Sequence, residues 1–194
     1  KHNIKKMSKN TDENISLSLP SGSSTGAPPI APKGIKTKPG QVICGDLDMR
    51  IDRNGVWHFQ GSPIGRKEIV RLFSTVLCRD DAGDYWLITP AEVGCIEVED
   101  TPFMAVELTA KGNSADQIIT LRTNIDALVT VDDNHPIRVD IDPKTKEPSP
   151  YLILDGGMEA RISRAVYYEL VSLGQERDGA FGVWSSGGFF SLGP

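Results

Sequence analysis

The order strand, tight turn, strand, helix, strand occurs twice in this chain and limits the possible folds more than any other feature. The first copy spans residues 47–89 and turns at Asn54 and Gly55, between two alternating polar and apolar segments. Asn-Gly is a strong hairpin signal, because both central residues of a type I′ turn need positive φ. The second copy spans residues 151–184 and turns at Gly156 and Gly157.

A helix is expected after each hairpin. Ser62 followed by Pro63 predicts the cap and first position of one helix, and Ser163 predicts the cap of the other. Apolar residues then recur at helical spacing, and Gly174 ends the second helix. We therefore predict an α+β fold of two small lobes. Each lobe is a mostly antiparallel curved sheet or roll with one helix, and the lobes are related by the repeated hairpin–helix–strand motif.

The composition changes near residue 40. Residues 1–39 are rich in Lys, Ser and Pro and carry a net charge of +5, whereas the rest of the chain carries −10. Residues 1–39 contain too few apolar residues to offset the entropy of ordering, so we predict a flexible arm. An N-terminal β-rich lobe with one helix is expected at 40–109, and a C-terminal α/β lobe with one helix at 110–194.

Several function classes are disfavoured. The acidic body repels phosphate backbones, so we expect no nucleic-acid partner. No apolar run approaches the ~20 residues of a membrane span, and the N-terminus lacks the apolar part of a signal peptide. Three cysteines without close spacing indicate free thiols and a cytoplasmic protein. His58 and His135 lack neighbouring ligands, so we expect no metal, no cofactor and no assignable catalytic residue.

Arg66 and Arg164 lie in the expected first turns of the two helices. A cation is unfavourable there, because the helix N-terminus is the positive end of the dipole. Either a neighbouring carboxylate pairs with each arginine, or an anionic ligand binds between the lobes where the helix starts could face each other.

Several motifs follow one another in the order typical of a known family. They are CGDLDMRI at 44–51, GVW at 55–57, GSPIGR at 61–66, TP at 89–90, DTPF at 100–103, TLRTN at 120–124, HP at 135–136 and GVWSSG at 182–187. From Val42 onward the chain resembles the bacterial family known as domain of unknown function 1285. The segment after Pro90 departs from the family pattern, because it lacks a lysine after the glutamate.

The resemblance implies two lobes with repeated motifs, no assigned activity and a suggested part in signal transduction. It establishes no catalytic residue. Candidate ligand-binding residues follow from motif membership, together with Arg164 from the helix argument: Arg50, Ser62, Arg66, Thr89, Asn124, His135, Arg164 and Trp184.

Three functions stay open. The leading hypothesis is a non-enzymatic cytoplasmic binding or regulatory protein, with a small anion or a protein as its partner and an undetermined oligomeric state. The alternative is an enzyme that acts on a small polar anionic substrate, with His58 or His135 as acid–base and arginines that hold the anion. The third is a protein-docking module with Trp184, Phe189 and Phe190 as an exposed contact patch.

Overall fold

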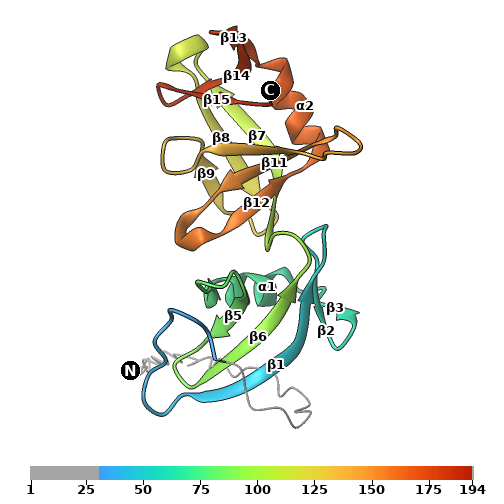
Figure 1. Cartoon of the computed structure of the whole chain (residues 1–194), viewed down its shortest axis with the longest axis vertical. Helices are drawn as coiled ribbons and strands as arrows, with labels where there is room; N and C mark the ends of the chain where they lie inside the picture. The colour runs from blue at the N-terminus through green and yellow to red at the C-terminus, as the bar shows by residue number, and fades with distance from the viewer. Residues whose placement is uncertain (1–30, 194) are drawn as a thin grey trace, which may run out of the picture.

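The computed structural model describes residues 31–193, which form two lobes stacked along the long axis of the molecule (Figure 1). The first lobe holds α1 (Lys67–Ser74), and the second holds α2 (Arg164–Ser172). Strands make up most of both lobes, which confirms the α+β class. Within the described range, no helix is long and apolar enough to cross a membrane. The predicted flexible arm lies outside the described residues as far as residue 30.

The first lobe is built on one six-stranded sheet in the order β3-β2-β1-β6-β5-β4. Its strands are β1 (Val42–Ile51), β2 (Trp57–Phe59), β3 (Ser62–Pro63), β4 (Leu77–Arg79), β5 (Tyr85–Ile88) and β6 (Glu92–Val98). The two central strands, β1 and β6, run parallel, and all other neighbours are antiparallel.

The second lobe contains a six-stranded sheet in the order β10-β11-β12-β7-β8-β9 and a three-stranded sheet, β13-β14-β15. The strands of the larger sheet are β7 (Phe103–Lys111), β8 (Ile118–Thr123), β9 (Leu128–Thr130), β10 (Ile137–Ile141), β11 (Pro148–Ile153) and β12 (Glu159–Ile162). The smaller sheet consists of β13 (Gln175–Arg177), β14 (Ala180–Ser185) and β15 (Gly188–Ser191), and short 3-10 turns lie at η1 (Ser114–Asp116) and η2 (Asp155–Gly157).

The feature that occurs twice in the structure is the six-stranded sheet, once in each lobe. Counted within each lobe, both six-stranded sheets have the order third, second, first, sixth, fifth, fourth, with the first and sixth strands parallel. The hairpin–helix order also occurs twice, but the strands after α1 join the same sheet, whereas those after α2 form the separate small sheet. The two hairpin–helix units are therefore not equivalent in strand order, although the lobes are alike in topology.

Three local predictions need correction. Ser62 and Pro63 form β3, and α1 begins at Lys67 with Arg66 as its N-cap, so Ser62 caps no helix. Gly55 has φ of 71° but Asn54 is not in the left-handed region, so the β1–β2 turn is not type I′. By contrast, the predicted cap at Ser163 is present, because its hydroxyl accepts the N–H of Val166. The β7 strand belongs to the second sheet, whereas a boundary at 109/110 assigns most of it to the first lobe.

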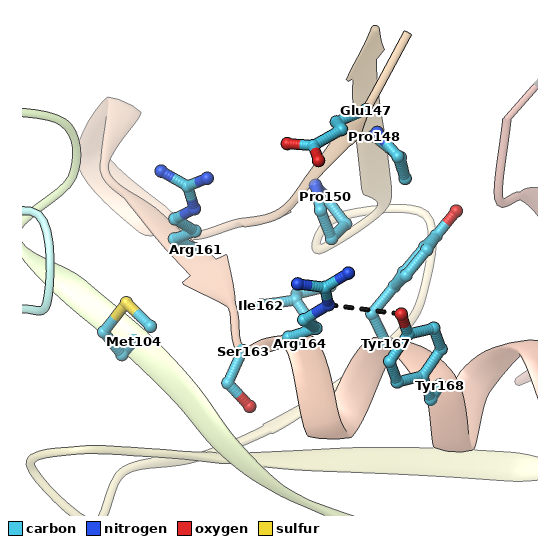
Figure 2. A pocket seen from close by; sticks show the side chains of 10 residues that line it. All are labelled: Met104, Glu147, Pro148, Pro150, Arg161, Ile162, Ser163, Arg164, Tyr167 and Tyr168. Carbon is cyan, nitrogen blue, oxygen red and sulfur yellow. Dashed lines mark hydrogen bonds between the residues drawn. The ribbon is translucent and has the colours of Figure 1, made fainter. Parts of the chain in front are cut away.

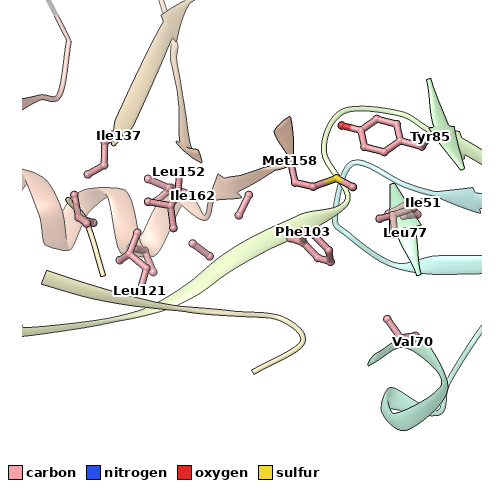
Figure 3. Packing of buried hydrophobic residues seen from close by; sticks show 14 of the residues in the cluster. Ile51, Val70, Leu77, Tyr85, Phe103, Leu121, Ile137, Leu152, Met158 and Ile162 are labelled. Atoms are coloured by element: carbon pink, nitrogen blue, oxygen red, sulfur yellow. The ribbon is translucent and has the colours of Figure 1, made fainter. Parts of the chain in front are cut away.

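The two lobes share one continuous cluster of buried apolar residues. Figure 3 shows Phe103 and Met158 of the second lobe beside Ile51, Leu77 and Tyr85 of the first. Ile51 is fully buried, and the other four are at most 8% exposed. Removing this apolar surface from water favours contact between the lobes.

Polar contacts border this shared core. The side-chain amide of Asn124 donates to the Gly55 carbonyl over 3.0 Å, and Arg79 donates to the Gly157 carbonyl over 3.1 Å. On α1, Lys67 and Arg71 both pair with Asp126 of the second lobe. These contacts fix the position of one lobe against the other.

The described end of the arm is attached to the first lobe. The Lys33 N–H donates to the Asp80 carboxylate over 2.9 Å, and the Asp81 N–H donates back to the Lys33 carbonyl over 3.1 Å. Pro32 is buried. The part of the predicted arm from residue 31 onward thus makes specific contacts with the turn after β4.

Candidate functional site

A pocket of about 240 Å³ lies where β12 leads into α2 (Figure 2). We call it the arginine pocket, and its lining residues are Met104, Glu147, Pro148, Pro150, Arg161, Ile162, Ser163, Arg164, Tyr167 and Tyr168. All of them belong to the second lobe. Only α2 contributes a helix start to this pocket, so a site between two facing helix starts stays a prediction.

Arg161 connects the pocket to the segment between the lobes. Its Nη1 donates to Oδ2 of Asp100 over 2.7 Å, and the Tyr151 hydroxyl donates to the other carboxylate oxygen over 3.1 Å. The Arg161 backbone N–H also donates to the Thr101 hydroxyl over 3.2 Å. These bonds orient the Arg161 guanidinium and leave part of its donor fork available to a ligand.

Arg164 is held mainly by an aromatic neighbour. Its Nε donates to the Tyr168 hydroxyl over 3.1 Å, and its guanidinium lies 5.7 Å from the centre of that ring. The hydrogen bond to Tyr168 raises the pKa of Arg164, and the negative charge of Glu147 adds to the effect. Among the described residues, no carboxylate forms an ion pair with Arg164, so both terminal nitrogens of its guanidinium can donate to a ligand.

The remaining walls are mixed in character. Pro148, Pro150, Met104 and Ile162 supply apolar surface, and Pro150 and Ile162 are themselves buried. Tyr167 is fixed because its hydroxyl donates to the Leu192 carbonyl over 2.6 Å. Such a combination of apolar walls and a few fixed polar groups is typical of small-molecule sites.

A second hollow of about 200 Å³ lies on the first lobe. We call it the histidine pocket, lined by Asp46, Asp48, Met49, Arg50, His58, Gly61 and Glu97. Its Arg50 already pairs with Glu99. Because three carboxylates line the hollow and its only arginine is neutralised, it suits an anion poorly.

His58 in that hollow forms a pair with a turn carboxylate. Its Nε2 lies 3.2 Å from Asp52, and its Nδ1 is buried without a hydrogen-bond partner among the described residues. Burial opposes ionisation of Asp52, but hydrogen bonds from the Val56 N–H and from His58 outweigh it and lower the Asp52 pKa. The described residues that line this hollow include no serine, threonine or cysteine that could act as a nucleophile.

The other candidate residues lie outside the arginine pocket. Ser62 and Arg66 are exposed at β3 and before α1. Thr89 is buried and stabilises a tight turn, because its hydroxyl bonds to both the N–H and the carbonyl of Glu92. Asn124 joins the lobes through Gly55. Thr89 and Asn124 therefore make hydrogen bonds within the fold, and these bonds explain the presence of both residues in their motifs without a ligand.

His135 and Trp184 also have local partners. His135 Nδ1 lies 3.1 Å from Asp132, and the His135 N–H and ring together lower the pKa of that carboxyl against the opposing effect of burial. Trp184 packs edge-on to Phe189 with ring centres 5.4 Å apart, and the Arg177 guanidinium lies over its ring at 4.7 Å.

The predicted aromatic contact patch was wrong in part. Phe190 is buried, and Trp184 and Phe189 are only half-exposed beneath Arg177. Within the described part of the chain, no group of three or more His, Cys, Asp or Glu side chains could hold a metal ion.

Sequence reasoning located Arg164 but missed Arg161, Glu147 and the two tyrosines. Arg161 alternates with buried residues on β12 and comes two residues before the Ser163 cap, so its position at the strand end was readable from the sequence. Glu147 lies in a proline-rich loop, and the pairing of β11 with β12 brings it to the pocket.

Comparisons with known proteins agree with this architecture. A family model described as “Domain of unknown function (DUF1285), N-terminal domain” matches residues 38–101. A second, “Protein of unknown function (DUF1285), C-terminal domain”, matches residues 102–192. No curated protein matches the chain.

Two crystal structures are similar to this chain. A DUF1285 family protein from Silicibacter pomeroyi DSS-3 is 42% identical, with a TM-score of 0.74 over 84% of this chain and 90% of that one. A duf1285 family protein from Shewanella baltica OS155 is 27% identical, with a TM-score of 0.51 over 64% of this chain and 90% of that one. The resemblance seen in the sequence motifs is therefore confirmed.

Proposed function

The chain belongs to the DUF1285 family, and because both family models are described only as being of unknown function, we propose a function from the site itself. The protein is a non-enzymatic binding protein that takes up a small anionic molecule in the arginine pocket. The observation that carries this proposal is the Arg164 guanidinium, which is fixed through Nε and has no ion-pair partner among the described residues. A second guanidinium, that of Arg161, lines the same pocket.

The bound form serves regulation in the cytoplasm, in keeping with the part in signal transduction that the family resemblance suggests. Free thiols at Cys44, Cys78 and Cys95 support a reducing compartment. Arg161 supports a regulatory role, because it pairs with Asp100 in the segment that joins the lobes.

An enzyme is the second candidate, and the His58–Asp52 pair favours it. A histidine oriented by a carboxylate is a common acid–base arrangement. However, the arginines that would hold an anionic substrate line a different pocket. The two histidines and the two pocket arginines thus lie at separate places, which favours binding without catalysis.

A thermal-shift experiment tests the binding proposal. Phosphate, nucleotides and small carboxylates, including α-amino acids, are added to the wild-type protein, to Arg164→Met and to Arg66→Met. Arg66 is the matched control, because it is an exposed arginine at the start of the other helix and does not line the pocket. At a ligand concentration of 100 Kd, binding stabilises the folded state by about 2.7 kcal/mol, which corresponds to a rise in Tm of roughly 5–10 °C.

We expect at least one anion to raise the Tm of the wild type and of Arg66→Met, but not of Arg164→Met. The proposal fails if no member of the panel shifts the wild type, or if Arg164→Met retains the full shift.

A further inference from the structure

The charges around the arginine pocket sum to zero. Arg161 is neutralised by Asp100 at 2.7 Å, and Arg164 lies within the electrostatic influence of Glu147. The arginines come from the β12–α2 side, and Glu147 comes from the opposite wall, at the start of β11 (Figure 2). The pocket therefore offers a cationic side and an anionic side, not a uniformly positive surface.

This arrangement discriminates between anions by their charge. A phosphate or nucleotide with two or more negative charges meets the Glu147 carboxylate in the pocket wall, and the charge of Arg161 is already balanced by Asp100, so the excess negative charge is repelled. A molecule with one carboxylate and one ammonium group finds a complementary group for each of its charges.

The size and the walls restrict the ligand further. A cavity of about 240 Å³ is smaller than the roughly 300–1,000 Å³ of pockets for drug-sized molecules. Met104, Ile162 and the prolines Pro148 and Pro150 provide an apolar lining for the part of the ligand without charge.

We propose that the ligand is a free α-amino acid with an apolar side chain. Its carboxylate binds the Arg164 and Arg161 guanidiniums, its ammonium binds the Glu147 carboxylate, and its side chain lies against Met104 and the prolines. This inference depends on the proposed function, because it assigns a ligand class to the same pocket.

Isothermal titration calorimetry with matched probes tests the inference. The amino acids are L-leucine, L-isoleucine, L-valine, L-methionine and L-phenylalanine. 4-Methylpentanoate has the carbon skeleton of leucine without the ammonium, and L-leucinamide lacks the carboxylate. We expect at least one of the amino acids to bind, and its analogue without the ammonium to bind about tenfold more weakly or worse, as for loss of a charge-assisted hydrogen bond. The amide of that amino acid is expected not to bind.

The Glu147→Gln variant tests whether the Glu147 carboxylate binds the ammonium group of the ligand. We expect this variant to bind the amino acid and its des-amino analogue with nearly equal affinity. Glu169→Gln is the matched control, because Glu169 is an exposed glutamate of α2 that does not line the pocket. The control retains the wild-type preference, and far-UV circular dichroism verifies that both variants are folded.

The outcomes separate the two proposals. If the des-amino analogue binds as tightly as the amino acid, or if only phosphates or nucleotides bind, the amino-acid class is overturned and anion binding stands. If neither the amino acids nor any anion of the thermal-shift panel binds, both proposals fail. A preference for the amino acid that survives Glu147→Gln overturns the role of Glu147 and with it the inference.

Discussion

The turn after β4 depends on one buried carboxylate, Asp80, and its replacement by asparagine is the sharpest test of the folding argument. One Asp80 oxygen accepts the N–H groups of Ala82 and Asp84 at 2.9 and 3.0 Å. The other accepts the Lys33 N–H at 2.9 Å and the Trp86 indole N–H at 3.1 Å. Asparagine keeps one acceptor oxygen, so two of these four donors then face an NH₂ group.

The magnitude follows from these four bonds. Each hydrogen bond to a charged group contributes about 1.5–3 kcal/mol, so the loss of two lowers the free energy of unfolding by about 3–6 kcal/mol. Because a domain is stable by only about 5–15 kcal/mol, this is a large fraction of the total. With a urea m-value of about 2 kcal/mol/M, the midpoint falls by roughly 1.5–3 M.

The effect also depends on pH. Burial alone raises the Asp80 pKa, but the four N–H donors outweigh it and hold the pKa below the ordinary value of 3.8. A lowered folded pKa contributes stability above the unfolded pKa, and this contribution is lost as the pH falls through the folded pKa. The difference in the free energy of unfolding between wild type and Asp80→Asn is therefore largest at pH 7 and becomes smaller below about pH 4.

Urea unfolding followed by far-UV circular dichroism measures both effects. Asp81→Asn is the control, because Asp81 is the exposed neighbour in the same turn. An Asp80→Asn variant as stable as Asp81→Asn, or a difference that does not change between pH 7 and pH 3, refutes the reasoning.

Three further predictions concern the shared core, the lobe contact and a half-buried thiol, that of Cys95. Phe103→Ala lowers the free energy of unfolding by about 3–5 kcal/mol in urea titrations, because it leaves a cavity in the shared core; a loss below about 1 kcal/mol contradicts this. Gly55→Ala lowers stability by about 1–3 kcal/mol in thermal unfolding, because φ is 71° and the new Cβ lies 2.8 Å from Nδ2 of Asn124 and 2.9 Å from Cγ of Met104. Burial raises the Cys95 pKa to about 11, so iodoacetamide labels Cys95 roughly 100-fold more slowly at pH 8 in the folded protein than in urea. Equal labelling rates by mass spectrometry contradict that prediction.

Local signals in the sequence predicted the elements well, and long-range pairing explains the misses. The Ser163 cap and the Gly156–Gly157 turn depend on nearby residues, and both are present. Ser62 fits the same capping pattern, but Ser62 and Pro63 pair with β2 and form the strand β3 before the helix begins. A capping motif states a local preference, and pairing with a neighbouring strand overrides it.

The candidate site was predicted only in part, for the same reason. Arg164 was readable from its place after the Ser163 cap. Tyr168 lies four residues after Arg164 in α2, so this partner was also readable from helical spacing. By contrast, the proximity of Glu147 and the contact between Arg161 and Asp100 depend on how strands from distant parts of the chain pair and curve. No spacing in the sequence records these distances.

The segment that joins the lobes has a consequence for how such proteins can evolve. The two family models meet between Thr101 and Pro102, yet Thr101, Pro102 and Phe103 are all buried, and Thr101 bonds to the Arg161 backbone. A gene rearrangement at this point would separate the two domains that the family models match. It would also expose apolar surface on both, because the lobes share one buried core. We therefore expect the two halves to be inherited as one unit, with substitutions on either side of the junction compensating each other.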